Sequence, residues 1–351
     1  MGKKFDQRSP FKYPLTITWD ITSVCNANCI MCYSSSSSEK AIGNELNTDE
    51  ALRLVDEIAD MNVFSLSLSG GEPTLRRDLE IIIKRATDLG IGVSTGSNGI
   101  SVDRERLLKL KDNGLKIFVV SIHGVNAKTH DFIRGIQGSF EKAINTIKIA
   151  NEIGLSTGIS TTLMKYNYKE LPAILELALE LKVSFHSTSL FVATGRGNLQ
   201  QDLSPKEYQD FFKFWKLKRD ELYGRITLET HHETLYFLLD PSFLKDNIGH
   251  MGCLAGYSIM RITPDGYVTP CNLLPIVAGN VRKQKLKDIW KNAKIFQDLR
   301  NRKLLKGKCG LCEYKYICGG CRSTAYAYYK DILAEDPRCW YKPKQEESKN
   351  G

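Results

Sequence analysis

The sequence predicts an α/β protein, built as a partial (β/α)6 barrel of parallel strands with a C-terminal cysteine-rich domain. Three observations predict this fold class. Short apolar or β-branched runs alternate with longer amphipathic segments from Leu15 to about Phe191. The polar and sulfur-bearing residues that suggest chemistry follow directly after the predicted strands. Finally, 351 residues are more than one core usually needs, which favours a large domain and a smaller one.

Six segments have the length and composition of buried strands. We expect them near Leu15–Trp19, Val63–Ser69, Gly92–Ser97, Lys116–Ile122, Ser156–Leu163 and Ser184–Phe191. Most of the intervening segments have helical periodicity, and Thr48 is the predicted N-cap of the first. The predicted helices are Asp49–Met61, Asp78–Leu89, Asp103–Asn113, Phe140–Ile153 and Lys169–Leu181. Repeated βα units imply parallel strands with right-handed crossovers, and six units suggest an open barrel.

The pattern becomes less regular after residue 200. We expect a helix near Pro205–Tyr223 and a short strand near Arg225–Glu229. A hairpin is then predicted at Met260–Thr263 and Tyr267–Pro270, followed by a helix near Leu286–Leu299. The predicted domain limits are 1–200 for the barrel, 201–250 for a bridging segment, 251–343 for the cysteine-rich domain and 344–351 for a frayed tail.

The composition is that of a soluble globular protein, with 42% apolar and 25% charged residues. No apolar run approaches the roughly 20 residues of a membrane span, and the N-terminus lacks the apolar core of a signal peptide. We therefore expect a cytoplasmic protein without membrane contact. The net charge of +9 favours an anionic substrate or an acidic electron donor. The basic residues are scattered without interleaved aromatics, so we expect no nucleic-acid partner.

Three of the ten cysteines, Cys25, Cys29 and Cys32, lie within eight residues after the first predicted strand. In a reducing compartment such cysteines are expected to be metal ligands rather than disulfides. A four-iron cluster normally takes four cysteines, so three leave one iron open. That iron can chelate S-adenosylmethionine, which an electron cleaves to a 5'-deoxyadenosyl radical. A zinc site is the alternative, but the sequence offers no nearby fourth ligand.

The Cys-x3-Cys-x2-Cys motif followed by an aromatic residue resembles the signature of the radical S-adenosylmethionine superfamily. The resemblance implies that the segment Ser69–Pro73 holds the methionine amino group through its backbone and Glu72, because its glycines permit close approach. It also implies contacts of the cofactor ribose and carboxylate with polar residues after later strands, and an aromatic over the adenine. His123 departs from the aspartate common in relatives, which puts a carboxylate role there in doubt. The cofactor-binding residues implied in this way are Tyr33, Gly70, Gly71, Glu72, Pro73, Ser97, Asn98, Ser121 and Arg134.

The other seven cysteines are Cys253, Cys271, Cys309, Cys312, Cys318, Cys321 and Cys339. Two zinc sites would need eight ligands, and four of these cysteines are closer together than in a usual zinc ribbon. The spacing resembles the SPASM domain, which implies two auxiliary four-iron clusters and so three 4Fe–4S clusters in all. By that resemblance Cys309, Cys312, Cys318 and Cys339 hold one cluster. The other takes Cys253, Cys271 and Cys321, and its fourth ligand is not visible. Such clusters favour a net oxidation, although a structural role is the alternative.

The substrate is left open between two enzyme hypotheses. Several stretches, among them 190–197, 252–256 and 318–339, resemble haem-biosynthesis members such as Fe-coproporphyrin III decarboxylases. This implies oxidative decarboxylation of tetrapyrrole propionates, with an arginine such as Arg196 holding carboxylates. The serine-rich loop after Cys32 instead resembles peptide maturases. A third, non-catalytic hypothesis is an iron–sulfur electron carrier or a zinc-binding module. For the enzyme we expect a small-molecule or peptide substrate and a low-potential electron donor such as ferredoxin or flavodoxin.

Overall fold

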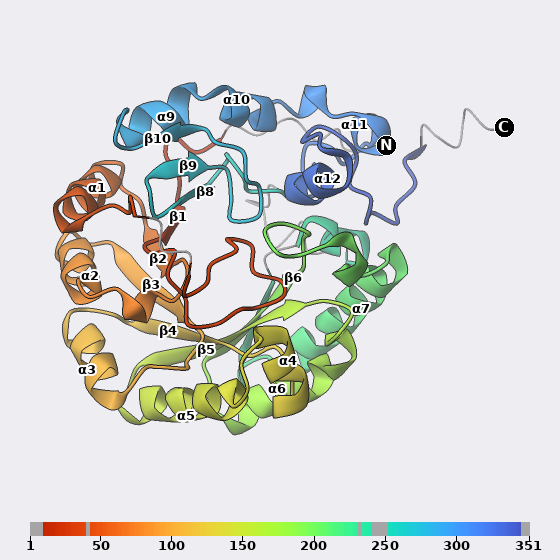
Figure 1. The fold of residues 1–351 in the computed structure, drawn as a ribbon. Coiled ribbons are helices and arrows are strands. Elements are labelled where there is room, and N and C mark those ends of the chain that lie inside the picture. Colours follow the sequence, from red (N-terminus) through yellow and green to blue (C-terminus); the bar gives the residue numbers. More distant parts are fainter. Residues whose placement is uncertain (1–9, 40–42, 231–232, 241–251, 345–351) are drawn as a thin grey trace.

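The computed structural model describes residues 10–39, 43–230, 233–240 and 252–344, and in them ten strands form one sheet (Figure 1). The strands are β1 (Thr16–Asp20), β2 (Ser65–Ser69), β3 (Gly92–Ser97), β4 (Ile117–Ser121), β5 (Ser156–Leu163), β6 (Phe185–Leu190), β7 (Thr227–Thr230), β8 (Ile259–Ile262), β9 (Tyr267–Thr269) and β10 (Gly279–Asn280). Strands β1 to β7 are parallel and follow in chain order. The predicted open, parallel barrel is therefore confirmed.

Helices cover the outside of this curved sheet (Figure 1). They are α1 (Thr48–Asp60), α2 (Leu79–Asp88), α3 (Arg104–Asp112), α4 (Ala127–Arg134), α5 (Ser139–Glu152), α6 (Leu171–Glu180) and α7 (Pro205–Glu221). The C-terminal helices are α9 (Leu286–Asn292), α10 (Lys294–Arg300), α11 (Gly307–Leu311) and α12 (Arg322–Tyr329). In Figure 1 these C-terminal helices lie across the side of the barrel between β1 and α7. None of the described helices is long and apolar enough to cross a membrane.

The two faces of the strands differ sharply in chemistry. In β1, Ile17 and Trp19 are fully buried and belong to the same core as Leu54 and Ile58 of α1. The alternate positions of the neighbouring strand β2 are all serine and only partly buried. Because side chains alternate between the faces of a strand, the inner face carries small hydroxyl residues.

Two predicted details of the helices are wrong. The first helix is capped by Asn47, whose side chain accepts from Glu50 N at 2.9 Å while the Glu50 carboxylate accepts from Asn47 N at 3.0 Å. This reciprocal capping box satisfies two donors, so it replaces the predicted cap at Thr48. The helix predicted over Leu286–Leu299 is two helices, because Ala293 between them is extended with ψ 127°.

The C-terminal hairpin belongs to the barrel sheet, which the sequence did not predict. Strand β8 pairs in parallel with β1, placing Arg261 beside Thr18, and β9 pairs antiparallel with β8. At the other edge, β7 from the predicted bridging segment pairs with β6. Residues 241–250 of that segment and 345–351 of the predicted tail lie outside the described residues. The cysteine-rich domain therefore extends the barrel sheet beyond β1.

Candidate functional site

The loop that carries Cys25, Cys29 and Cys32 follows β1 and is fixed by backbone hydrogen bonds. Asn28 N donates to Arg134 O at 3.1 Å, and Ile30 N donates to Ile133 O at 3.0 Å, so the end of α4 supports the middle of the loop. The ten cysteines of the chain are free thiols. The three cysteines of this loop are therefore available as ligands.

Each thiol of this loop has a polar neighbour from the loop or from another element. Arg134 Nη1 donates to Cys29 Sγ at 3.4 Å, and Asn98 Nδ2 lies 3.8 Å from Cys25 Sγ. Cys32 Sγ lies 3.4 Å from Ser34 Oγ. Burial raises the pKa of Cys25 to about 11, and the nearby Glu72 carboxylate contributes. A thiol with such a pKa becomes a thiolate when a metal replaces its proton, so this environment fits a cluster ligand.

The segment Gly70–Glu72 packs directly on the chain before Cys25. Gly71 N donates to Thr22 O at 2.7 Å, and Glu72 N donates to Val24 O at 2.8 Å. A Cβ atom on Gly71 would lie 2.1 Å from Val24 O, and Gly70 has φ +131°. Both positions therefore require glycine. Pro73 begins a short 3-10 helix, Pro73–Leu75, that turns the chain away from the loop.

The buried Glu72 carboxylate accepts hydrogen bonds from two other predicted site residues. Its Oε1 accepts from Ser97 Oγ at 2.8 Å, and its Oε2 accepts from Asn98 N at 2.7 Å. Oε1 also accepts two hydrogen bonds from Thr74. Since each carboxylate oxygen has two lone-pair directions, Oε2 has room for one further donor. That position suits an ammonium group of a ligand.

Arg134 connects the loop to β4. Its Nη2 donates to the backbone oxygen of Ser121 at 2.9 Å, and its Nη1 reaches Cys29. Its Nε is buried and has no hydrogen-bond partner among the described residues. A buried donor of a cation without a partner is costly. Its position beside a cluster thiol fits a bound anionic group there, such as a carboxylate.

Tyr33 lies in a different environment from the other predicted cofactor contacts. Its hydroxyl donates to Asp20 Oδ1 at 2.8 Å, and the Arg261 guanidinium lies 5.1 Å from its ring centre. This placement favours a structural role over an adenine contact. Met31, which the sequence did not single out, packs against the apolar group that includes Cys25 and Cys29.

Two other residues singled out in the sequence have structural partners. Arg196 donates from Nε to Cys29 O at 2.8 Å and from Nη1 to Ser36 O at 2.7 Å, so it holds the cluster loop. His123 is buried, and its Nδ1 accepts from Thr162 N at 3.2 Å. Burial, helped by the Arg134 charge, lowers the pKa of His123 well below its usual range, so the ring is neutral. It offers neither a carboxylate nor a cation.

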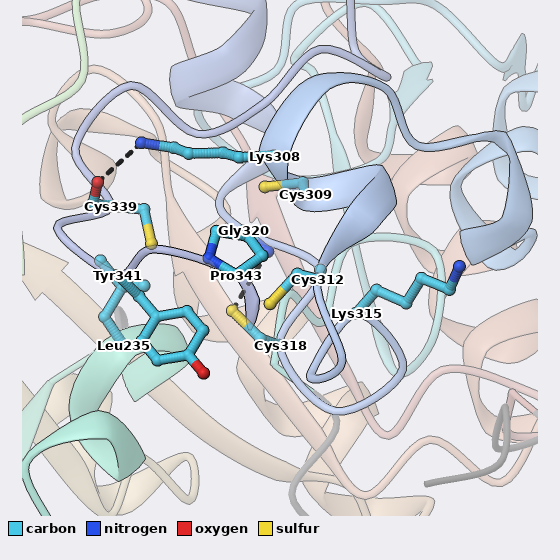
Figure 2. Close-up of a pocket in the computed structure, with 11 residues that line it drawn as sticks. Leu235, Lys308, Cys309, Cys312, Lys315, Cys318, Gly320, Cys339, Tyr341 and Pro343 are labelled. Atoms are coloured by element: carbon cyan, nitrogen blue, oxygen red, sulfur yellow. Dashed lines mark hydrogen bonds between the residues drawn. The ribbon is translucent and has the colours of Figure 1, made fainter. Parts of the chain in front are cut away.

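Four C-terminal cysteines surround one small cavity. Figure 2 shows the sulfur atoms of Cys309, Cys312, Cys318 and Cys339 around this space, with Lys308 and Lys315 at its edge. Gly320 N donates to Cys318 Sγ at 3.3 Å, and Asp336 N donates to Cys309 Sγ at 3.3 Å. Burial raises the pKa of Cys312 to about 11 and of Cys339 to about 12. This is the set that the resemblance assigned to one auxiliary cluster.

The remaining three cysteines form a second group. Burial raises the pKa of Cys271 to about 12, and the nearby Cys253 and Cys321 add to the rise. Cys271 Sγ lies 3.1 Å from the hydroxyl of the buried Ser323. The two groups adjoin, since Cys253 N donates to Cys318 O at 3.1 Å. In the described part of the chain, no three Cys, His, Asp or Glu side chains converge on a position for a single metal ion.

Comparisons with known proteins agree with both parts of this site. Residues 19–178 match the Radical SAM superfamily, and residues 253–321 match the SPASM iron–sulfur cluster-binding domain. The chain is 38% identical to the AdoMet-dependent heme synthase of Methanosarcina barkeri, over 94% of this chain and 97% of that protein. It is 28% identical to the PqqA peptide cyclase of Rhodopseudomonas palustris, over 95% and 88%. The fold resembles Streptococcus suis SuiB bound to S-adenosylmethionine, with a TM-score of 0.78 at 20% identity, covering 94% of this chain and 78% of that one.

Proposed function

Because this chain belongs to the radical S-adenosylmethionine superfamily and carries a SPASM domain, we propose that it oxidatively decarboxylates the propionate groups of a tetrapyrrole. The observation that carries this proposal is the 38% identity to a heme synthase over 94% of the chain. The enzyme prediction itself is confirmed by the family, so the non-catalytic hypotheses no longer apply.

We assign the catalytic cluster to Cys25, Cys29 and Cys32, whose thiols lie in one loop at the mouth of the barrel. When bound, this cluster supplies the electron that cleaves S-adenosylmethionine to the 5'-deoxyadenosyl radical, which removes hydrogen from the substrate. Glu72 Oε2 has room for the ammonium group of the cofactor, and the unpartnered Nε of Arg134 suits its carboxylate. Gly70, Gly71 and Pro73 shape the backbone of the same site.

Ser97, Asn98 and Ser121 complete the proposed cofactor site. The first two are fixed by Glu72, and Asn98 Nδ2 also donates to Asn26 Oδ1 at 2.7 Å in the cluster loop. Ser121 lies at the end of β4, where its carbonyl orients Arg134. These residues therefore orient the cofactor against the loop and exclude water from it, since Ser97 and Asn98 are buried.

The electron balance of the reaction gives the auxiliary domain a role. Each propionate that becomes a vinyl group releases carbon dioxide, one hydrogen atom and one electron. The radical takes the hydrogen atom, and the electron needs an acceptor. We propose that the two auxiliary four-iron clusters accept it. They are assigned to Cys253, Cys271 and Cys321, and to Cys309, Cys312, Cys318 and Cys339. A low-potential donor such as ferredoxin or flavodoxin is proposed to reduce the catalytic cluster.

The test is anaerobic incubation of the reconstituted chain with Fe-coproporphyrin III, S-adenosylmethionine and a reductant. We expect the mass of the tetrapyrrole to fall by the loss of carboxyl groups, with one 5'-deoxyadenosine formed for each. Cleavage of S-adenosylmethionine without any change in tetrapyrrole mass would contradict the substrate assignment. The second candidate is then peptide modification, which the 28% identity to a PqqA peptide cyclase favours.

A further inference from the structure

Two groups of the same three residue types join the barrel to the C-terminal domain. The first clamp consists of Asp20, Tyr33 and Arg261. The second clamp consists of Asp202, Tyr208 and Arg338. In each, a tyrosine hydroxyl donates to the aspartate, at 2.8 Å in the first and 2.6 Å in the second. In each, an arginine of the C-terminal domain lies over the tyrosine ring, at 5.1 Å and 4.6 Å from its centre.

The clamps lie at opposite edges of the open barrel. Asp20 ends β1, and Arg261 comes from β8, which pairs with β1. In the second clamp, Tyr208 lies in α7, and Arg338 Nη1 donates at 2.9 Å to the backbone oxygen of Phe191, directly after β6. The C-terminal domain is therefore held to the barrel at two places, at β1 and next to β6 and α7.

The charged side chains of both clamps are almost completely buried. The side chains of Asp20 and Arg261 are 0% and 8% exposed, and those of Asp202 and Arg338 are 2% and 3% exposed. Both tyrosine hydroxyls donate to the aspartate of their clamp, and both arginines lie over the tyrosine rings. A buried charged group with paired partners is strongly sensitive to the loss of any one of them.

The two clamps differ in the metal site that each adjoins. Tyr33 follows Cys32 directly, and its hydroxyl lies 3.3 Å from Ser69 Oγ, the residue before Gly70. Arg261 Nε also donates to Asp20 Oδ2 at 2.8 Å. The first clamp thus holds the end of the catalytic loop and the start of the glycine segment together. Arg338, by contrast, precedes the auxiliary ligand Cys339.

We propose that Asp20, Tyr33 and Arg261 are positioning residues of the catalytic cluster, through which the auxiliary domain fixes the loop that carries Cys32. The inference rests on the proposed role of Cys25, Cys29 and Cys32 as ligands. None of the three clamp residues is itself a ligand. They act by setting where Cys32 lies relative to Gly70–Glu72, and so where the open iron faces the cofactor.

The test compares Tyr33→Phe with the matched variant Tyr208→Phe in the reconstituted full chain. Each removes one hydroxyl that donates to a buried aspartate and keeps the ring. Electron paramagnetic resonance of the reduced protein is recorded with and without S-adenosylmethionine. We expect Tyr33→Phe to change the spectral response of the catalytic cluster to S-adenosylmethionine and to slow cofactor cleavage about tenfold, as for a lost charge-assisted hydrogen bond. Tyr208→Phe should keep the wild-type response of that cluster.

A second pair of variants covers the case in which one substitution impairs folding. Arg261→Gln leaves a buried, unpaired Asp20, whereas Asp20→Asn with Arg261→Gln removes both charges together. Both should reproduce the spectral change of Tyr33→Phe. If all of them respond to S-adenosylmethionine as the wild type does, the proposal is overturned while the proposed function stands. If the wild type itself has no cluster that responds, the proposed function fails, and the inference fails with it.

Discussion

The catalytic and the auxiliary cysteines hold their thiols in two different ways. The catalytic thiols lie in one loop of eight residues, and side chains from other elements, Asn98 and Arg134, reach two of them. The four thiols of Figure 2 surround a cavity, and their donors come from their own domain: two backbone N–H groups and the side chain of Arg322. Three ligands leave one iron free, whereas four enclose the cluster. The comparison teaches that an open iron depends on residues outside the ligand loop.

The largest expected effect is the loss of one cysteine ligand, which should have different consequences in the catalytic loop and in the auxiliary domain. Cys32→Ala should abolish 5'-deoxyadenosine formation, because the catalytic cluster loses one of its three ligands. Cys312→Ala should retain cofactor cleavage and lose most formation of oxidised product, because it removes a ligand of an auxiliary cluster. Chromatography of 5'-deoxyadenosine and mass measurement of the product distinguish the two.

Iron analysis supplies the control for this pair. The wild type should bind about twelve irons per chain, and each variant should lose about four. About four irons in the wild type would contradict the three-cluster assignment. If both variants lost cofactor cleavage equally while Cys312→Ala kept its catalytic iron, the catalytic and auxiliary clusters would not have the separate roles proposed.

The second prediction concerns the packing of Gly71 against the residues that precede Cys25. Gly71→Ala should lower the free energy of unfolding by about 3 kcal/mol, because its Cβ would lie 2.1 Å from Val24 O. The control is Gly43→Ala, where no heavy atom lies within 4 Å of the added Cβ, and we expect a change below about 0.5 kcal/mol. Denaturant titration under anaerobic conditions measures both. Equal stability of the two variants would show that the close packing is dispensable.

The ligands and the barrel could be predicted from the sequence because their signals are local. Three thiols in eight residues admit few chemistries, and alternating strand and helix patterns specify parallel pairing between neighbours. The alternation of serine and leucine in β2 is an equally local pattern, and it indicates which face of the strand is polar. Helix ends were less predictable, as Asn47 and Ala293 show, since caps depend on single backbone angles.

Contacts between distant segments could not be predicted. Nothing in the segment around Arg261 indicates a partner 241 residues earlier, because a strand pattern specifies a strand and not its neighbour. For the same reason Tyr33 was interpreted as an adenine contact from its position beside Cys32. Its contacts with Asp20 and Arg261 depend on the pairing of β8 with β1, which no local pattern indicates.

A smaller effect is expected at Arg134, which serves both the loop and the proposed cofactor carboxylate. Arg134→Gln should weaken the binding of S-adenosylmethionine by ten- to a hundredfold, which corresponds to about 1.5–3 kcal/mol for a charge-assisted hydrogen bond. Equilibrium binding to the reconstituted chain measures it. Arg104→Gln is the control, since Arg104 forms an exposed ion pair with Glu152. Similar affinities of the two variants would contradict the role of Arg134.

The smallest effect concerns the auxiliary group of Cys253, Cys271 and Cys321, which has a side-chain donor like the catalytic loop. With a cluster bound, Cys271 is a thiolate and the Ser323 hydroxyl, 3.1 Å away, donates to it. Such a bond stabilises the reduced, more negative cluster. Ser323→Ala should therefore lower the reduction potential of this cluster by about 40 mV, from about 1 kcal/mol in a one-electron couple.

The other two clusters are internal controls in the same redox titration, since Ser323 makes no hydrogen bond to their cysteines within the described residues. A potential shift confined to the cluster of Cys253, Cys271 and Cys321 would show that Ser323 donates to that cluster alone. This group would then resemble the catalytic loop in its three cysteine ligands and its side-chain donor, although it lies in the auxiliary domain. An unchanged potential would show that Ser323 does not donate to the bound cluster.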